Sequence, residues 1–361
     1  MIRPDKHLPK YYQLKEYLKQ MIQNGEITPA QKLPSESDLV RQFKISRDTV
    51  RHSFNELENE GWIYREQGRG TFCAYRGNKK EQKIAVLTTY ISNYIFPSII
   101  RGIEKILSEL GFSFSIASTG NNKRKEAECM KRFLEQDISG IIVEPTKSAK
   151  PNINQEYFQE LDKRNIPYIL LHAIYPDLDS AYIIMDDEKG GFLATQYLLK
   201  LGHKDIAGIF KSDDLQGIRR QAGFLSALNK YKVTVNNEFL GNYETEQMFS
   251  YPYHFTINLL QKKNRPTAIV CYNDQIAIQV MEAIRRSNLK IPGDISLVGY
   301  DNSNLAVATE VKLTTIKHPK EEMGKRVARM IVDMINGKVR KPCFVYQPEL
   351  IIRSSGKIFS K

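Results

Sequence analysis

The sequence predicts an α/β protein with a small N-terminal winged helix-turn-helix and a large two-lobed domain that contains two open parallel sheets. Three observations carry this prediction. Two short capped helices joined by a tight turn lie near the N-terminus, a glycine-rich hairpin follows them, and beyond residue 83 short apolar runs alternate with helical patterns. A chain of 361 residues is too long for one ordinary core, which agrees with two domains of unequal size.

Composition limits the possible classes of protein. The chain is 41% hydrophobic and 26% charged, and no stretch approaches the roughly 20 apolar residues of a membrane span. Residues 1–10 are polar and lack the apolar core of a secretory signal, so we expect a cytoplasmic, nucleoid-associated protein. The 4 cysteines stand singly, which predicts no zinc or redox site, and neither a metal nor a cofactor is expected. The net charge of +12 favours an anionic partner.

The N-terminal segment contains three short helical patterns. Leu14, Leu18 and Ile22 recur at four-residue spacing, which places them on one face of a first helix. Ser35 and Ser46 each precede another apolar helical pattern and are suited to cap its first turn. The second and third helices therefore form a helix-turn-helix.

A glycine-rich hairpin follows the third helix. Residues 62–65 and 71–74 are typical of two short strands, and residues 66–70 form the turn between them, which makes the hairpin a wing. Its tip is suited to the DNA minor groove, because a glycine lets the backbone approach closely. The side chains and backbone placed there are those of Gln67, Gly68 and Arg69.

The third helix is suited to enter the major groove with its N-terminal end first. That orientation places Arg47, Asp48, Thr49 and Arg51 within reach of base edges and phosphates. Asp48 is an anion facing phosphate, so it fits only if it accepts a hydrogen bond from a cytosine. Taken singly, each of these charges also suits the solvated face of an unrelated three-helix bundle.

The ordered motifs at residues 33–36, 46–51 and 68–72 make this segment resemble the GntR family of DNA-binding domains. Arg69 stands in the wing where that pattern has a third glycine, which points to an altered operator preference. The resemblance implies DNA contacts by Lys10, Glu36, Arg47, Arg51, Gln67 and Gly68. Together with the helix and wing positions, the expected DNA-binding set is Lys10, Ser35, Glu36, Ser46, Arg47, Thr49, Arg51, Gln67, Gly68 and Arg69.

The domain boundaries follow from a change in pattern. Residues 1–75 form the head, residues 76–83 are a polar and charged linker, and residues 84–361 form the large domain. The large domain reads as two successive βαβ series, each with a parallel sheet. The predicted strands are 84–88, 112–117, 140–143, 168–171 and 182–185 in the first series and 206–210, 268–271 and 295–298 in the second; the predicted helices are 97–110, 125–134, 190–201 and one that runs through residue 228.

Polar and aromatic side chains follow nearly every predicted strand. Open α/β sheets bind ligands beyond the carboxyl ends of their strands, so these positions are candidates for a binding site. Carboxylates, amides and a guanidinium beside aromatic rings suit a sugar, which needs paired donors and acceptors and apolar packing. Taken singly, Asp187 and Asp274 also suit helix caps, His172 a core histidine and Arg220 a surface ion pair.

The large domain resembles the effector domain of LacI/GalR-type repressors, which is periplasmic-binding-protein-like, through the motifs at residues 202–207, 220–224, 273–274, 298–301 and 313–316. The resemblance implies that Arg220, Asn273 and Asp301 bind sugar hydroxyls and that His172 and His318 border the cleft. The expected effector-binding set is Tyr90, Ser92, Phe96, Glu144, Lys147, His172, Arg220, Asn273, Asp301 and His318.

Segments 88–97, 144–148 and 311–319 narrow the match, because they resemble a family of arabinose-responsive repressors that joins a GntR-type head to a LacI-type body. The resemblance implies a sugar-responsive repressor of carbohydrate utilisation genes, released from its operator by L-arabinose. We expect a homodimer on palindromic double-stranded operator DNA, because two-fold symmetry lets two heads contact two half-sites. We expect the helix over residues 322–335 to be a crossover helix whose apolar stripe belongs to the core.

Three alternatives remain open at this stage. An enzyme is one, because Asp186–Asp187 and Asp213–Asp214 are acidic pairs suited to a metal, but the sequence has no nucleophile elbow, HExxH, phosphate loop or dinucleotide fingerprint. A transporter-feeding binding protein is another, against which the head and the lack of an export signal argue. The third is the same regulator with a hexose, a sugar phosphate or a purine as its ligand; a phosphate favours more cations in the cleft than Lys147 and Arg220 provide.

Overall fold

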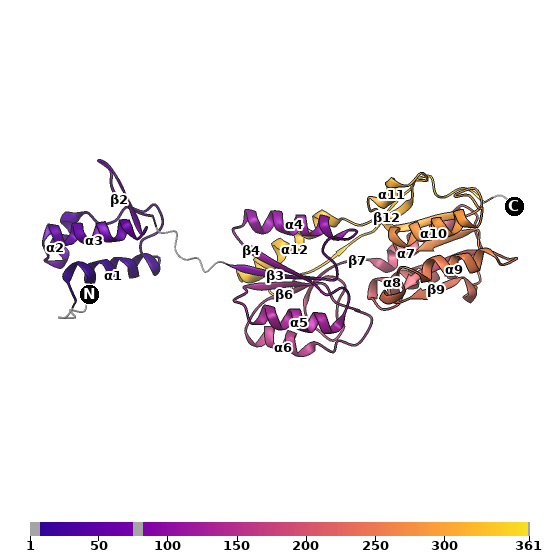
Figure 1. The fold of residues 1–361 in the computed structure, drawn as a ribbon, viewed down its shortest axis with the longest axis horizontal. Coiled ribbons are helices and arrows are strands. Elements are labelled where there is room, and N and C mark those ends of the chain that lie inside the picture. The colour runs from indigo at the N-terminus through magenta and orange to yellow at the C-terminus, as the bar shows by residue number, and fades with distance from the viewer. Residues whose placement is uncertain (1–7, 75–81, 360–361) are drawn as a thin grey trace. The chain divides into compact units, whose positions relative to one another are not determined.

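A computed structural model describes residues 8–74 and 82–359. The chain divides into two compact units between Glu81 and Gln82 (Figure 1), and each is described by itself. Residues 75–81, which make up most of the predicted linker, lie outside the described residues. Lys83, which we assigned to the linker, is instead the first residue of a strand.

The head has the predicted three helices and hairpin. Its apolar core gathers one face of each helix around residues such as Leu14, Leu18, Val50, Phe54 and Leu57, all of which are buried. The hairpin strands pair with Ile63 opposite Cys73, one residue away from the predicted strand bounds. The elements are α1 Lys10–Gln23, α2 Glu36–Phe43, α3 Arg47–Asn59, β1 Ile63–Glu66 and β2 Gly70–Cys73.

The first lobe of the large unit is a six-stranded parallel sheet of order β13-β7-β6-β5-β3-β4. Helices α4 and α12 cover one face of this sheet and α5 and α6 cover the other (Figure 1). The elements are β3 Lys83–Thr88, α4 Phe96–Glu109, β4 Ser113–Ser118, α5 Lys123–Leu134, β5 Gly140–Val143, α6 Gln155–Lys163, β6 Tyr168–His172, β7 Ala181–Met185, α12 Lys320–Ile335 and β13 Cys343–Tyr346.

The second lobe is a six-stranded sheet of order β14-β12-β11-β10-β8-β9, in which only β14 is antiparallel to its neighbour. Its two faces pack against α7 and α8 and against α9 and α10. The elements are α7 Asp187–Lys200, β8 Ile206–Lys211, α8 Leu215–Lys230, η1 Asn237–Phe239, β9 Leu240–Tyr243, η2 Thr245–Gln247, α9 Tyr251–Leu260, β10 Ala268–Cys271, α10 Asp274–Arg286, β11 Ser296–Asp301, α11 Leu305–Ala308, β12 Thr314–Lys317 and β14 Glu349–Ile351.

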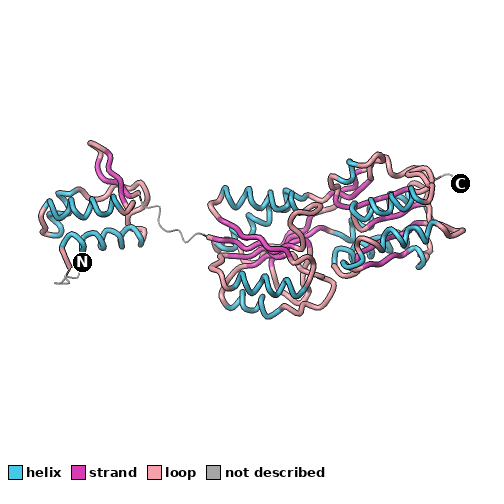
Figure 2. Tube along the Cα trace, viewed as in Figure 1, coloured by secondary structure: helices cyan, strands magenta, loops and turns pink. Residues whose placement is uncertain are grey.

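The chain crosses between the lobes three times: at Asp186, at His318–Pro319 and at Gln347–Pro348. Figure 2 shows strands of both sheets running toward this junction. The apolar side of α12 packs into the first lobe through Met323, Val327 and Ile331, which confirms it as a crossover helix with a core face. Three short crossings form a hinge, because few backbone angles have to change for the lobes to move.

Glycines let one pair of helices pack closely in each lobe. In the first lobe a Cβ at Gly324 would collide with the carbonyl oxygen of Ile99 on α4. In the second lobe a Cβ at Gly223 on α8 would collide with the carbonyl oxygen of Glu188 on α7. A side chain at either position would force the helices apart, so these contacts set the helix spacing.

The hydrophobicity of the helices and the burial of the cysteines can be read from the described part of the chain. No helix within residues 8–74 and 82–359 is long and apolar enough to cross a membrane. Of the four cysteines, which were predicted to stand singly, Cys73, Cys129 and Cys271 are buried and Cys343 is exposed.

Candidate functional sites

The helix-turn-helix is built from two capped helices. The Ser35 hydroxyl accepts a hydrogen bond from the Asp38 backbone at 3.2 Å and caps α2. The Ser46 hydroxyl accepts from the Thr49 backbone at 3.2 Å and caps α3. Capping leaves the N-terminal end of α3 well formed, with its positive dipole end available to an anion such as a phosphate.

The predicted head residues lie on exposed surface or at its edge. Arg47 and Arg51 at the start of α3 are exposed, and both contact α2: Arg47 donates to the Ser37 hydroxyl at 3.2 Å, and Arg51 donates to the Glu36 carboxylate at 3.2 Å. Lys10 is exposed at the first turn of α1. Exposed ion pairs of this kind are weak, so the arginines can exchange them for phosphate or base contacts.

The wing tip has the backbone freedom that its sequence predicts. Gly68 has a φ of +76° and Gly70 a φ of +121°, both in the left-handed region that favours glycine. Gln67 and Arg69 are exposed at the tip, and Arg69 donates to the Glu66 carboxylate at 2.6 Å. Arg65 was not among the predicted DNA-binding residues. It is an exposed cation on β1 that donates to Asn55 on α3 at 2.8 Å. Side chains alternate between the two faces of a strand, and this alternation after the buried Ile63 could have indicated an exposed neighbour.

A cavity of about 940 Å³, its mouth included, lies between the two lobes of the large unit. Loops after the strands of both sheets line it, as the strand-end rule predicts. The lining combines five aromatic rings with carboxylates, amides and two cations. The polar groups on which the description below rests are Glu144 and His172 from the first lobe and Lys211, Asp214, Arg220, Asn273 and Asp301 from the second.

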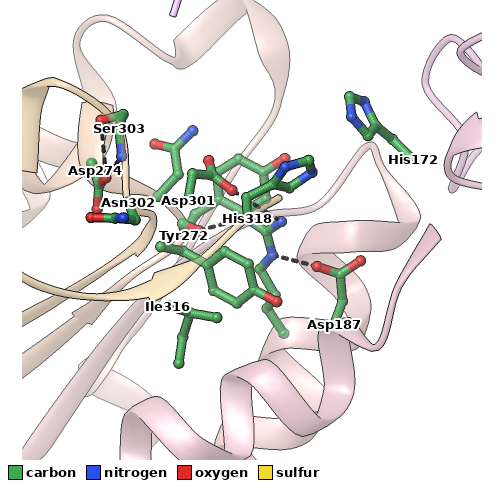
Figure 3. Close-up of polar contacts among 12 residues, drawn as sticks. His172, Asp187, Tyr272, Asp274, Asp301, Asn302, Ser303, Ile316 and His318 are labelled. Atoms are coloured by element: carbon green, nitrogen blue, oxygen red, sulfur yellow. Dashed lines mark hydrogen bonds and ion pairs between the residues drawn. The ribbon is translucent and has the colours of Figure 1, made fainter. Parts of the chain in front are cut away.

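Arg220 is the centre of the second-lobe side of the cavity. It is 2% exposed, donates to Asp187 at 2.8 Å and to the Tyr272 carbonyl at 2.8 Å, and lies 3.7 Å from the Asp301 carboxylate. The guanidinium also stacks on the Tyr300 ring, with 3.6 Å to its centroid. Figure 3 shows Asp187, Tyr272, Asp301 and His318 gathered in this region.

Electrostatics hold Arg220 charged. Burial alone would lower the pKa of Arg220, but Asp187 and Asp301 outweigh it and raise that pKa well above its usual range. Burial also outweighs the guanidinium at Asp187 and raises the pKa of that carboxyl. Burial favours a protonated Asp187, whereas the ion pair with Arg220 favours an ionised one. The 2.8 Å contact supports the ionised form, because a guanidinium keeps its proton and stabilises a carboxylate beside it.

Glu144, His172 and His318 form the first-lobe side of the cavity and its junction with the hinge. Glu144 accepts from the Thr89 backbone at 2.6 Å and shares a hydrogen bond with His172 Nδ1 at 2.9 Å. His172 Nε2 has no hydrogen-bond partner among the described residues. The rings of His172 and His318 contact edge to face, with 5.2 Å between centroids. A buried imidazole with an open nitrogen is suited to pair with a ligand hydroxyl.

Lys211 is the second buried cation of the cavity. Its ammonium group lies 2.8 Å from the Asp213 carboxylate and 2.9 Å from the Asp214 carboxylate. Burial alone would lower the pKa of Lys211, but Asp214 and Asp213 raise it above its usual value. Like the guanidinium of Arg220, the ammonium group of Lys211 is therefore protonated, and two neighbouring carboxylates balance its charge.

Most of the predicted effector-binding residues meet in this cavity. Three do not line it: Ser92 is exposed on the loop before α4, Lys147 contacts the opposite lobe, and His318 is buried in a crossover, where its ring contacts that of His172. The predicted residues that line the cavity are Tyr90, Phe96, Glu144, His172, Arg220, Asn273 and Asp301.

Two cap assignments were wrong. Asp186, and not Asp187, caps α7, and Asn273, and not Asp274, caps α10. The freed carboxylates point inward, where Asp187 binds Arg220 and Asp274 accepts from Thr315 at 2.6 Å and from the Ser303 backbone at 2.7 Å (Figure 3). The surface interpretation of Arg220 was also wrong, because the side chain is fully enclosed.

Several lining residues were missed at the sequence level. The strand-end rule could have found six of them, because they end or follow strands β3, β5, β8 and β10: Thr89, Tyr94, Ile95, Pro145, Lys211 and Tyr272. The others lie on helix starts and on a loop that no local pattern connects to the cavity. They are Asn121, Gln216, Met248, Phe249 and Gln275.

Among the described residues, one group of carboxylates lies close enough to share an ion: Asp213, Glu244 and Glu246. Two lysines of the first lobe already contact it, Lys147 at Glu246 and Lys150 at Glu244. The metal suggested by the pair Asp213–Asp214 therefore competes with amino groups at this position.

A winged helix-turn-helix attached to a hinged two-lobed domain with an interlobe cavity defines a ligand-responsive transcription regulator. Comparisons with known proteins agree. Residues 10–73 match the gntR family of bacterial regulatory proteins, and residues 195–356 match the periplasmic binding protein-like domain.

The chain is 46% identical to the arabinose metabolism transcriptional repressor of Geobacillus stearothermophilus over 98% of this chain and 99% of the relative. It is 43% identical to the protein of the same name from Halalkalibacterium halodurans over 96% of both chains. The chain belongs to the family of the arabinose metabolism transcriptional repressors. Its relatives are transcription regulators and not enzymes.

Solved structures show the same fold. A LacI family regulator from Enterococcus faecium with bound ribose has a TM-score of 0.66 at 27% identity, covering 77% of this chain and 100% of that one. The lac repressor dimer bound to operator has a TM-score of 0.67 at 23% identity, covering 78% of this chain and 96% of that one. A CelR–cellobiose complex has a TM-score of 0.67 at 22% identity, covering 86% and 92%.

Proposed function

We propose that this repressor binds palindromic operator DNA as a homodimer in the cytoplasm, at the nucleoid, and is released when L-arabinose enters the interlobe cavity. The observation that carries the proposal is the cavity itself, in which aromatic rings surround carboxylates, amides and an open imidazole nitrogen. A sugar presents hydroxyl groups, which donate and accept hydrogen bonds, together with apolar C–H faces. The polar groups of the cavity suit the hydroxyls, and its aromatic rings suit the C–H faces. The names of the relatives at 43–46% identity support arabinose as the sugar.

The charge state of the cavity favours a neutral ligand over a sugar phosphate. Both cations that line it, Lys211 and Arg220, are buried and each lies against two carboxylates. A phosphate would have to displace those carboxylates from the cations and leave them buried without a partner, which costs several kcal/mol, at least about 3. Hydroxyl groups can instead bind the remaining lone pairs and N–H groups.

We assign the operator contacts to the exposed start of α3 and to the wing. Arg47, Thr49 and Arg51 lie where a recognition helix meets base edges and phosphates, and Gln67, Gly68 and Arg69 lie at the wing tip. Ser35 and Ser46 contribute through their caps, and Lys10 and Glu36 complete the set. A helix-turn-helix contacts one half-site, which supports a dimer on a palindrome.

The hinge supplies the link between ligand and DNA. A sugar enclosed by both lobes binds the closed arrangement better than the open one and therefore shifts the population toward closure. Release requires that the closed dimer space its two heads less favourably for the operator, and the same coupling free energy then weakens sugar binding on DNA.

The direct test is fluorescence anisotropy of a labelled fragment from the promoter of the arabinose-utilisation genes, titrated with purified repressor. L-arabinose, D-arabinose, D-ribose, ribose 5-phosphate and hypoxanthine are then added separately. We expect release by L-arabinose alone; its mirror image is the matched control, because it carries the same groups in a geometry that a chiral cavity rejects.

Other outcomes decide between the alternatives. Release by ribose 5-phosphate or by hypoxanthine would replace arabinose with that ligand class and keep the repressor. Equal binding to a fragment with one half-site scrambled would contradict the dimer on a palindrome.

A further inference from the structure

Lys147 was predicted to contact the effector, but it does not line the cavity. Its ammonium group reaches the opposite lobe, where it lies 2.6 Å from the Glu246 carboxylate and 3.7 Å from Asp213. A second lysine on the same loop, Lys150, lies 2.7 Å from Glu244. Two cations of the first lobe therefore meet three carboxylates of the second lobe, none of which is joined to them by a nearby crossover.

Neutral contacts accompany these ion pairs. Asn121 Nδ2 donates to the Thr245 hydroxyl at 2.6 Å, and the Leu215 backbone donates to the Ser148 hydroxyl at 2.9 Å. All of these bonds join the first lobe to the second, so all of them are lost when the lobes separate. They form a closure contact made of residues 121 and 147–150 on one side and 213–215 and 244–246 on the other.

The first-lobe side of this contact is held in place by its own lobe. Lys147 has a φ of +41°, a left-handed conformation that is unusual for a residue with a side chain. Its backbone donates to Asn121 Oδ1 at 2.7 Å, and the preceding backbone N–H, of Thr146, donates to the fully buried Glu126 at 3.1 Å. Because these partners belong to the first lobe, the loop presents Lys147 in the same way whether the lobes are open or closed.

The second-lobe side is fixed in a similar way. Asp213 is fully buried and accepts from the Thr245 backbone at 3.0 Å and from the Thr245 hydroxyl at 2.6 Å. Asp213 is thus anchored before closure, and its bonds to Thr245 hold the turn that carries Glu244 and Glu246. Preorganisation on both sides lowers the entropy that closure has to overcome.

We propose that Lys147, with Lys150, is a positioning residue that stabilises the closed arrangement of the lobes and thereby sets the apparent affinity for the sugar without contacting it. The proposal rests on the proposed function, because a ligand that selects the closed lobes binds with an apparent affinity proportional to the closed fraction. The carboxylate of Glu246 and both members of the Lys150–Glu244 pair are open to solvent. Solvent and salt weaken such pairs, so the effect of one pair is a few-fold and depends on salt.

The test is isothermal titration calorimetry of L-arabinose binding to the full chain. We expect Lys147→Gln to weaken binding about fivefold, Lys147→Arg to restore most of it, and wild-type affinity to fall toward that of Lys147→Gln when salt is raised from about 0.1 M to about 1 M. Operator affinity without sugar is expected to stay unchanged, since the open arrangement binds DNA.

A charge swap separates closure from folding. Lys150→Glu and Glu244→Lys should each weaken sugar binding, and the double variant should bind within about twofold of the wild type. The matched control is the pair Lys262–Glu238, which lies at 2.9 Å with similar exposure but entirely within the second lobe. The same swap there is expected to leave sugar binding unchanged.

Three results would overturn the proposal. One is wild-type affinity in Lys147→Gln at every salt concentration. Another is a loss of sugar affinity above about a hundredfold in Lys147→Gln that salt does not change and that Lys147→Arg does not restore. That result would show that Lys147 contacts the sugar. The third is an equal effect of the control swap.

A protein that binds no pentose at all would instead contradict the proposed function, and closure would then be measured on its own. Spin labels at Lys163 of the first lobe and Arg286 of the second, both exposed, report the interlobe distance without a ligand. Equal distance distributions in the wild type and in Lys147→Gln would then reject the role of Lys147.

Discussion

The imidazole of His318 lies in the crossover between β12 and α12, at the point where the lobes are joined. It is 2% exposed, and neither ring nitrogen has a hydrogen-bond partner among the described residues. Burial is the main cause that lowers the pKa of His318 well below its usual range, and the neighbouring His172 adds to it. A neutral, unpaired histidine beside the cavity is a costly arrangement for stability alone, which agrees with a role in ligand binding or hinge motion.

This burial predicts a pH-dependent stability. The unfolded chain takes up a proton on His318 below the ordinary histidine pKa of about 6.5, whereas the folded chain does not, so folding stability is present above that pH and is lost as pH falls. Between about pH 7.5 and 5.5 the loss from this group is about 1.4 kcal/mol. Urea denaturation of the sugar-free protein measures it.

His318→Phe is expected to lack that component, and the difference in pH slope between it and the wild type isolates His318 from all other groups. His254→Phe is the matched control, because His254 is exposed on α9. Parallel slopes for the wild type and His318→Phe would contradict a neutral buried His318.

A second prediction at this scale concerns Arg47. Arg47→Ala is expected to weaken operator binding by about 1–3 kcal/mol if the side chain reads a base. Arg47→Lys keeps the charge but loses the bidentate geometry, so it should recover little of that loss. Anisotropy across several salt concentrations checks this: a loss accompanied by a reduced salt slope and rescued by lysine would assign Arg47 to a phosphate instead.

Individual side chains mark the limit of what the sequence predicts. Strand-end logic placed Glu144, His172 and Asn273 near the cavity, because parallel strands end at one edge. It could not tell that the cap of α10 falls on Asn273 and leaves Asp274 inside, since both residues are good caps. It also could not separate Lys147 from the ligand set, because the partners of Lys147 are almost a hundred positions away in sequence.

At the level of elements, the close contact of α7 and α8 places the cavity arginine. Gly223 on α8 lies against the Glu188 carbonyl of α7, and Gly191 on α7 lies against the carbonyl of Arg220. The backbone of Arg220 is thus one of the surfaces through which the helices touch. The spacing of the two helices therefore fixes where the guanidinium meets Asp187 and Asp301.

Gly223→Ala is expected to force α7 and α8 apart, to cost about 1–3 kcal/mol of stability and to weaken sugar binding, while operator binding remains. Thermal denaturation and sugar titration measure both effects. Ser226→Ala, on the exposed side of the same helix, serves as the comparison and should change neither. A stable Gly223→Ala with unchanged sugar affinity would show that the spacing is adjustable.

Most long, strongly patterned elements were predicted, but the helices α9 and α10 and the short edge strands were not. The helices of the head and the central strands of both sheets have clear periodicity and appear within a few residues of the predicted bounds. Strands β13 and β14 are short and lie at sheet edges, so their residues lack the continuous apolar run of a central strand. Their positions depend on the three crossings, which only the folded chain defines.

For the molecule as a whole, the division into two contact units implies two unfolding events. The single tryptophan of the chain, Trp62, belongs to the head, whereas most helices and strands belong to the large unit. Tryptophan fluorescence therefore reports the head, and far-ultraviolet circular dichroism reports mainly the two lobes.

This separation gives a prediction for the whole chain. L-arabinose at 100 times its dissociation constant is expected to stabilise the lobes by about 2.7 kcal/mol and to leave the fluorescence transition of the head in place. Operator DNA at low salt should do the reverse. If both probes shift together with sugar alone, the head and the lobes unfold as one, which would contradict two separate unfolding events.

The three crossings also determine how the protein can be divided. Residues 320–346 return to the first lobe and residues 349–351 complete the sheet of the second, so neither lobe is a continuous piece of chain. During synthesis neither sheet can be completed until residues 343–351 have been made, because β13 and β14 supply the last strand of each lobe. A nonsense mutation before residue 343 therefore removes a strand from both sheets at once, and it cannot leave an intact single lobe attached to the head.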